Sequence, residues 1–224
     1  MKSTNSITVL LAEDHVIVRE GLRRLLEAEA DIAVIGEAST GRQAVQLTKK
    51  LRPSVVIMDI AMPLLNGLEA TRQILKSVPA TRVLILSAHS DDPYVEQAIA
   101  LGAAGYLIKQ TAGHVLPEAI REVARGNIFF SPAIAKRLDL HRPKTPRWAS
   151  LPVKQAPDLT SREMEVLQLI AEGKANKATA EELGIGIKTV EKHREHLMSK
   201  LDIHDIAGLT RYAIARGIIE SGFS

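Results

Sequence analysis

The chain has 224 residues, no cysteine and a formal net charge of +3 at pH 7. Its length suits one large domain or two small ones with a sizeable core. The lack of cysteine excludes disulfides, thiolate catalysis and cysteine-ligated zinc, and it fits a reducing compartment.

The first half of the chain alternates short apolar runs with amphipathic helical patterns. The run Ile7–Ala12 has the length of a strand and is too short for a signal-peptide core or a membrane span, so we expect a soluble, cytoplasmic protein without a membrane segment. Four more strands are predicted at residues 32–35, 55–58, 83–86 and 105–108, and helical spacing follows the five strands at residues 18–26, 41–51, 68–75, 93–101 and 117–125. This alternation predicts an α/β fold, a doubly wound five-stranded parallel sheet with helices on both faces.

The strand at residues 55–58 consists of four consecutive apolar residues and is followed by a lone carboxylate, Asp59. Such a strand is expected to be buried on both faces. Pro63 ends the extended segment and Asn66-Gly67 predicts a turn, which leaves Asp59 at the rim of the sheet. A carboxylate in this position can act as a nucleophile, as a metal ligand or as a helix cap.

Polar side chains stand at or just after the ends of four predicted strands: Glu13, Asp14, Asp59, Ser87 and Lys109. The carboxyl ends of parallel strands lie at one rim of the sheet, where open α/β folds bind their ligands. We therefore expect these side chains to form a site. The alternative is that they only cap the following helices and solvate loops.

The chemistry of this set favours phosphoryl transfer. Clustered carboxylates repel one another and need a hard cation, and magnesium suits oxygen ligands while keeping open positions for water and phosphate oxygens. A carboxylate in such a site can attack a phosphoryl group and form an acyl phosphate. Lys109 would pair with the phosphoryl charge, and the Ser87 hydroxyl would donate to a phosphate oxygen.

The segment from residue 7 to about 126 resembles the receiver domain of two-component response regulators. It matches that family in the order and spacing of its acid pair, acceptor aspartate, serine and lysine, which are Glu13, Asp14, Asp59, Ser87 and Lys109. The resemblance, which assigns residues 1–126 to a receiver domain with a flavodoxin-like fold, implies that Asp59 accepts phosphate from a sensor histidine kinase. It also implies that Asp14, Asp59 and the Ala61 carbonyl bind magnesium directly, with Glu13 acting through a water molecule. Ser87 and Tyr106 would form the switch pair, in which the aromatic side chain moves inward. Glu13 stands where aspartate is more frequent.

Residues 127–158 have the composition of a connecting segment. A short helix is predicted at Ser131–Leu140, and residues 141–158 are rich in proline and basic residues. Beyond them every pattern is helical. Thr160 or Ser161 can cap a helix with Glu163 near the capping-box position, and further helices are predicted at Asn176–Leu183, at about 187–201 and at 205–216.

The helix at residues 187–201 combines a narrow apolar arc with a basic and polar face. Two helices joined by Gly184-Ile185-Gly186 resemble a helix-turn-helix, whose second helix enters the major groove of DNA. The alternative is an ordinary solvated helix face. Residues 1–126 hold 14 Lys and Arg against 14 Asp and Glu, and residues 127–224 hold the remaining 15 and 12, a mild excess that permits nucleic acid binding without requiring it.

A longer pattern strengthens this interpretation, because residues 159–224 resemble the LuxR/NarL-type DNA-binding domain over nearly its full length. The matching positions include Leu159-Thr160-Ser161-Arg162-Glu163, Leu183-Gly184-Ile185, Lys188-Thr189-Val190, His193 and Lys200-Leu201. The resemblance implies that Lys188, Thr189 and Lys192 read bases, with His193 and Lys200 nearer the DNA backbone. Glu191 and Glu195 would repel phosphate, so they must point away or reject wrong sites. Thr179 replaces a usual isoleucine, which predicts looser packing.

The whole chain is therefore identified as a member of the NarL/FixJ type of response regulator. We expect a transcription factor, not an enzyme, that is switched by phosphorylation of Asp59 and binds double-stranded promoter DNA as a homodimer. The last helix would form the dimer contact, and RNA polymerase is a further expected partner. The sequence leaves open whether phosphorylation releases the second domain or promotes dimerisation.

Three other functions would require different features in this chain. A phosphohydrolase with an aspartyl nucleophile commonly carries a general acid two residues later, and here that residue is Ala61. A flavin protein would need a phosphate-cradling loop after the first strand, where the chain has Glu13-Asp14. The third alternative is a DNA-binding protein whose receiver domain no longer signals.

Overall fold

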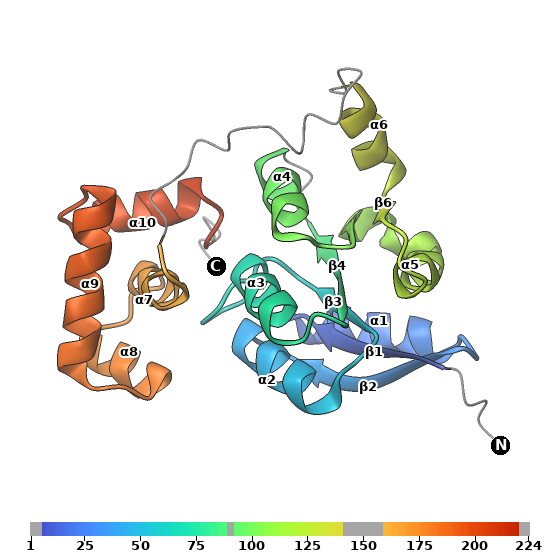
Figure 1. Cartoon of the computed structure of the whole chain (residues 1–224), viewed down its shortest axis with the longest axis horizontal. Helices are drawn as coiled ribbons and strands as arrows, with labels where there is room; N and C mark the ends of the chain where they lie inside the picture. The colour runs from blue at the N-terminus through green and yellow to red at the C-terminus, as the bar shows by residue number, and fades with distance from the viewer. Residues whose placement is uncertain (1–5, 89–91, 141–158, 220–224) are drawn as a thin grey trace. The chain divides into compact units, whose positions relative to one another are not determined.

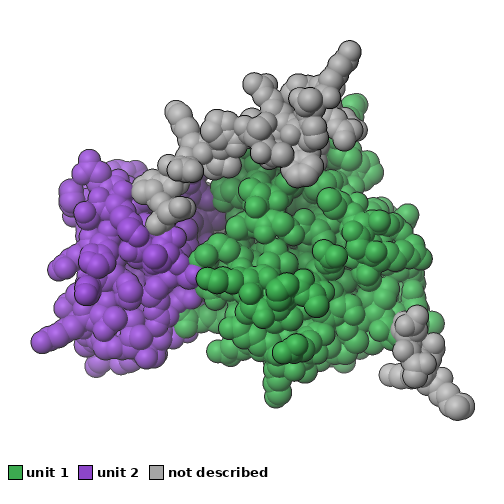
Figure 2. All heavy atoms as spheres, in the orientation of Figure 1, with its two compact units in different colours: residues 1–63, 67–151 green, residues 64–66, 152–224 purple. Residues whose placement is uncertain are grey.

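The computed structural model describes residues 6–88, 92–140 and 159–219. The chain divides into two compact units, one formed by Met1–Pro63 and Gly67–Leu151 and the other by Leu64–Asn66 and Pro152–Ser224 (Figure 2). Each unit is described by itself below. The proline-rich part of the predicted connecting segment, residues 141–158, lies outside the described residues.

A parallel sheet with the strand order β2-β1-β3-β4-β5-β6 forms the centre of the first unit (Figure 1). The strands are β1 (Ile7–Ala12), β2 (Ile32–Ala38), β3 (Val55–Met58), β4 (Arg82–Ser87), β5 (Gly105–Ile108) and β6 (Phe129–Phe130). The chain moves from β1 outward to β2 and then returns to the other side of β1 as β3. Ligands of open α/β sheets bind where the strand order reverses in this way, so the ends of β1 and β3 mark the expected site.

Helices cover both faces of this sheet (Figure 1). Helices α1 (Val16–Glu27) and α5 (Lys109–Ala124) lie on one face, and α2 (Gly41–Leu51), α3 (Gly67–Ser77) and α4 (Asp92–Leu101) lie on the other. All four residues of β3 are buried, and the side chains of Val55 and Ile57 join the core formed with α1 and α5. The prediction of a strand buried on both faces is therefore confirmed.

Two features of this unit differ from the sequence prediction. The sheet has a sixth strand, because Phe129 and Phe130 pair in parallel with Gly105 and Tyr106. Helix α5 begins at Lys109 instead of Pro117, which lies inside the helix. Strand β6 and the following helix α6 (Pro132–Leu140) are grouped with the first unit, although the sequence assigned both to the connecting segment.

The second unit contains four helices among its described residues, α7 (Ser161–Ala171), α8 (Asn176–Leu183), α9 (Ile187–Leu201) and α10 (Ile206–Ala215). The predicted capping box is present, since the Thr160 hydroxyl accepts from the Glu163 N–H and the Glu163 carboxylate accepts from the Thr160 N–H. Gly184 ends α8 in the left-handed conformation that the predicted turn requires. The core of the unit is formed by apolar residues of all four helices, including Val166, Leu183, Val190 and Leu209.

None of the helices within the described residues combines the length and the apolar character needed to cross a membrane.

Candidate functional site

The ends of β1, β3 and β5 bring four of the predicted site residues together. Glu13 and Asp14 follow β1, Asp59 follows β3, and Lys109 follows β5. Glu13 and Asp59 are each only 2% exposed. The Asp59 N–H donates to the Ala12 carbonyl at 2.9 Å, so the ladder between β1 and β3 continues to the site and fixes the acceptor beside the acid pair.

The loop after Asp59 packs so closely that one position requires glycine. The Gly67 N–H donates to the Ile60 carbonyl at 2.8 Å, and Ile60 also accepts from the Met62 N–H at 3.0 Å. A Cβ atom at Gly67 would lie 1.8 Å from the Asp59 carbonyl oxygen. Gly67, which was predicted to lie in a turn, is the first residue of α3. Its missing side chain allows the backbone to pack directly against the Asp59 carbonyl.

The Lys109 ammonium bridges two buried carboxylates. Its Nζ lies 2.8 Å from Glu13 Oε2 and 2.8 Å from Asp59 Oδ2. Burial raises the pKa of Asp59 to about 6, repulsion from Glu13 adds to the shift, and Lys109 opposes it. For Lys109 itself, burial disfavours the charged form, but the attraction and hydrogen bonding to Asp59 and Glu13 together outweigh that effect and raise the pKa. One cation thus balances only part of the negative charge in this cluster of carboxylates.

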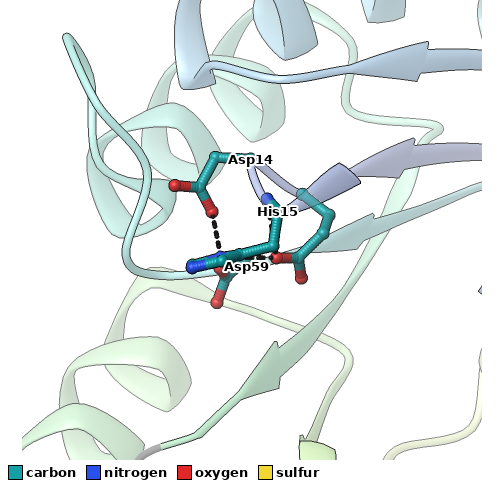
Figure 3. Close-up of side chains that lie close together, drawn as sticks. Asp14, His15 and Asp59 are labelled. Carbon is teal, nitrogen blue, oxygen red and sulfur yellow. Dashed lines mark hydrogen bonds and ion pairs between the residues drawn. The ribbon is translucent and has the colours of Figure 1, made fainter. Parts of the chain in front are cut away.

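Asp14 and His15 complete the cluster. Ligand atoms of Glu13, Asp14, His15 and Asp59 all lie within 4.8 Å of one another, and Figure 3 shows three of these side chains turned toward one another at the strand ends. Nδ1 of His15 lies 2.8 Å from Asp14 Oδ1, and the negative charge of Asp14 raises the pKa of His15. Within the described residues, Asp14 Oδ1 and Asp59 Oδ2 are buried without an aligned hydrogen bond, despite the nearby His15 and Lys109 nitrogens.

Ser87 and Tyr106 occupy the two strands beyond β3. Ser87 ends β4 and is 1% exposed, and it lies beside Ile108 in the register of β4 and β5. Tyr106 lies in β5 and is fully buried. The predicted switch residues are thus on neighbouring strands, and the aromatic side chain already occupies an interior position in this structure.

In the second unit, α9 separates an apolar side from a polar one. Val190 and Leu197 are buried, whereas Lys188, Thr189 and Lys192 are exposed. His193 is half-buried. Glu191 and Glu195 are exposed on the same helix, so its polar side carries both signs of charge.

Two known families match separate parts of the chain. The family described as the response regulator receiver domain matches residues 9–121. The family described as bacterial regulatory proteins, luxR family, matches residues 157–213. The chain belongs to the NarL/FixJ-type response regulators.

The chain also aligns with similar proteins over most of their length. The transcriptional regulatory protein LiaR of Bacillus subtilis is 41% identical over 207 residues, which cover 92% of this chain and 96% of LiaR. The transcriptional regulatory protein DegU of Brevibacillus brevis is 35% identical, with 90% of each chain covered. A solved complex of the response regulator RcsB with DNA aligns with a TM-score of 0.58 and 26% identity, covering 95% of this chain and 99% of RcsB. This response regulator is accordingly a DNA-binding regulator of transcription and not an enzyme.

Three residues of the response regulator have contacts that the sequence did not predict. His15 joins the acidic cluster, and its position directly after the acid pair was the only available signal. Arg19 donates from Nη1 to the Glu13 carbonyl at 2.6 Å. Lys200, which was predicted to lie near the DNA backbone, donates from Nζ to Glu163 Oε2 at 2.7 Å and thereby ties α9 to the start of α7.

Thr179, for which the resemblance implies looser packing, lies in the core of the second unit. The residue is completely buried in α8, and its hydroxyl has no hydrogen-bond partner among the described residues. The core beside α8 therefore contains a buried polar atom that has no hydrogen-bond partner among the described residues.

Proposed function

We propose that this response regulator is switched by transfer of a phosphoryl group from a sensor histidine kinase to Asp59. The observation that carries the proposal is the convergence of Glu13, Asp14, Asp59 and Lys109 at adjacent strand ends, with Lys109 Nζ 2.8 Å from the acceptor carboxylate. An Asp59 oxygen forms a new bond to phosphorus while the bond from phosphorus to the kinase histidine breaks. The electron pair of that bond returns to the imidazole nitrogen of the kinase.

Lys109 and Ser87 are proposed to receive the phosphoryl oxygens. Lys109 already holds the Asp59 carboxylate, and its positive charge would remain beside the group after transfer. Ser87 ends the next strand, and its hydroxyl would donate to a phosphoryl oxygen. Movement of Ser87 would be coupled to Tyr106 on β5, which we propose as the second residue of the switch. Its burial in this structure supports a coupling through the interior of the sheet.

The residues at this site fit a magnesium ion. The buried oxygens Asp14 Oδ1 and Asp59 Oδ2 lack aligned hydrogen bonds among the described residues, and a group of carboxylates is the ligand set that magnesium prefers. We propose that Asp14, Asp59 and the carbonyl of Ala61 hold the ion directly, with Glu13 acting through water. When bound, the ion would supply positive charge that neutralises the incoming phosphoryl group.

Two exposed apolar side chains near the acidic cluster support docking of the kinase. Val16 and Ile17 begin α1, separated from the acid pair by His15, and are 55% and 87% exposed. Exposed aliphatic side chains that lie next to each other are available for contact with a partner protein. We propose that they contact the kinase domain that presents the phosphohistidine.

The DNA contacts are proposed to come from α9. Lys188, Thr189 and Lys192 are exposed on its polar side and would reach base edges in the major groove, with His193 nearer the backbone. For Lys200, the ion pair with Glu163 would have to open before the ammonium could contact a phosphate. The exposed carboxylates of Glu191 and Glu195 would lower affinity for any sequence that offers them no donor, so we propose that they act against wrong sites.

We further propose that the regulator binds promoter DNA as a homodimer. In α10, Leu209 and Ala213 are buried in the core of the unit, whereas Ile206 and Ile214 are exposed. These two side chains extend the apolar stripe beyond what the unit itself buries, which supports a contact between two copies. Such a dimer predicts half-sites about one helical turn apart. With DNA and RNA polymerase as partners, its place of action would be the cytoplasm.

The test is phosphorylation of the purified chain by acetyl phosphate or a competent kinase in magnesium buffer, followed by intact mass spectrometry. We expect one phosphoryl group on the wild type and none on Asp59→Asn. Sustained release of phosphate from a small phosphate ester, dependent on Asp59, would favour the phosphohydrolase alternative. Phosphorylation elsewhere, or none at all, would remove the proposed switch.

A further inference from the structure

The guanidinium of Arg19 fastens the backbone that carries the acid pair. Arg19 lies in the second turn of α1, and its side chain is 16% exposed. Nη1 donates to the Glu13 carbonyl at 2.6 Å and lies 3.4 Å from the Asp14 carbonyl. Nε donates to Glu37 Oε2 at 3.2 Å, so the same side chain is anchored to β2.

We propose that Arg19 is a positioning residue for phosphorylation, which holds the loop after β1 so that the Glu13 and Asp14 carboxylates face Asp59 and the magnesium ion. This inference rests on the proposed function of Asp59. Arg19 binds the backbone carbonyls and not the carboxylates, so it leaves the carboxylate oxygens available to a cation. Groups that hydrogen-bond to metal-ligand residues and orient them, without binding the metal themselves, contribute strongly to metal affinity.

The loop needs such a clamp because its side chains repel one another. Glu13 and Asp14 lie beside Asp59, and Lys109 balances only part of their charge. Few other contacts hold this backbone: the Glu13 N–H donates to the Ala38 carbonyl at 3.0 Å, and the His15 N–H donates to Glu13 Oε1 at 3.2 Å. Without Arg19, repulsion would be relieved by outward movement of the loop, and the acid pair would lose its alignment.

Positioning and simple charge predict opposite signs for the loss of Arg19. Removing a positive charge near the acidic cluster should strengthen the binding of Mg²⁺ by Coulomb attraction alone. If Arg19 instead holds the ligands in place, its removal should weaken binding. The direction of the change in the dissociation constant therefore decides between the two roles.

The experiment measures Mg²⁺ binding to the full chain by isothermal titration calorimetry. We expect Arg19→Ala to raise the Kd by about 10- to 100-fold, as for other groups that orient metal ligands. Arg19→Lys keeps the positive charge but loses the planar guanidinium with its several N–H donors, so its Kd should fall between those of wild type and Arg19→Ala. Arg24→Ala, an exposed position on the same helix, is the matched control and should change the Kd by less than about twofold.

A second readout separates alignment from chemistry. The rate of Asp59 phosphorylation by acetyl phosphate is measured against Mg²⁺ concentration for each variant. For Arg19→Ala we expect a higher Mg²⁺ requirement and a maximal rate close to wild type, because bound ion would realign the ligands. If Arg19→Ala does not fold, as judged by circular dichroism, the comparison of Arg19→Lys with Arg24→Ala carries the test.

Failure of the proposed phosphorylation at Asp59 and failure of the proposed role of Arg19 would give different results. A wild-type chain that neither binds Mg²⁺ nor gains phosphate at Asp59 would remove the proposed function itself. A wild-type chain that does both, with an Arg19→Ala variant that binds Mg²⁺ equally well or more tightly, would overturn only the positioning role. A loss of affinity in Arg24→Ala equal to that in Arg19→Ala would also overturn it.

Discussion

The charged Asp59 carboxylate should destabilise the receiver unit when no metal is present. The Asp59 pKa is raised from 3.8 to about 6, first by burial and then by repulsion from Glu13. A shift of about two units corresponds to roughly 3 kcal/mol of free energy. Since asparagine resembles the protonated acid, Asp59→Asn should raise the free energy of unfolding at pH 7.5 in EDTA by up to about 3 kcal/mol.

The sign of the pH dependence follows from the same shift. Between pH 3.8 and about 6, the folded state binds more protons at Asp59 than the unfolded state does. The wild type should therefore lose stability as the pH rises through this window, and the full penalty should be present above pH 6. The advantage of Asp59→Asn should accordingly disappear near pH 4, where the wild-type carboxyl is also protonated in the folded state.

Urea titration with hydrogen-exchange mass spectrometry measures this effect in the full chain, because peptides covering β1 and β3 report on the first unit alone. Glu20→Gln, an exposed acid on α1, is the matched control and should stay within about 0.5 kcal/mol of wild type. Saturating Mg²⁺ should narrow the gap by stabilising the wild type. An Asp59→Asn variant less stable than wild type in EDTA, or an advantage that persists at pH 4, would refute the reasoning.

Three further predictions concern single contacts. Gly67→Ala should lower the free energy of unfolding by more than about 2 kcal/mol and abolish Asp59 phosphorylation, because the new Cβ would lie 1.8 Å from the Asp59 carbonyl oxygen. A variant with the urea midpoint and the phosphorylation of the wild type would contradict this. Thr179→Val should raise the stability of the second unit by about 1 kcal/mol, since it removes a buried hydroxyl that has no partner among the described residues. A lower urea midpoint for the peptides that cover α8 would contradict this. Lys192→Ala should weaken operator binding, measured by fluorescence anisotropy at fixed salt, and leave phosphorylation intact; loss of both would indicate misfolding.

The sheet and the acidic cluster could be predicted from the sequence because both depend on simple rules. A strand buried on two faces requires an unbroken apolar run, and residues 55–58 supply one. Parallel strands end at one rim, so residues that follow β1, β3 and β5 had to come close to one another. Capping residues such as Thr160 act over one helical turn, a distance that sequence spacing describes well.

Features that depend on local exceptions could not be predicted in this way. Proline favours the first turn of a helix, so Pro117 suggested a helix start, but α5 continues through it from Lys109. Strand β6 has only two residues and follows no alternating pattern. The contact of Arg19 is made with backbone carbonyls, which are present at every residue and leave no mark in the sequence. Lys200 matched a DNA-facing pattern while its partner, Glu163, lies 37 positions away.

The central claim is that phosphate on Asp59 controls how the second unit binds DNA. The most direct measurement is the affinity of wild type and Asp59→Asn, each with and without a phosphodonor and Mg²⁺, for promoter fragments recovered from genome-wide binding, at one stated salt concentration. We predict that the phosphodonor tightens binding of the wild type and leaves Asp59→Asn unchanged. Equal affinity of phosphorylated and unphosphorylated wild type, or the same response in Asp59→Asn, would contradict it.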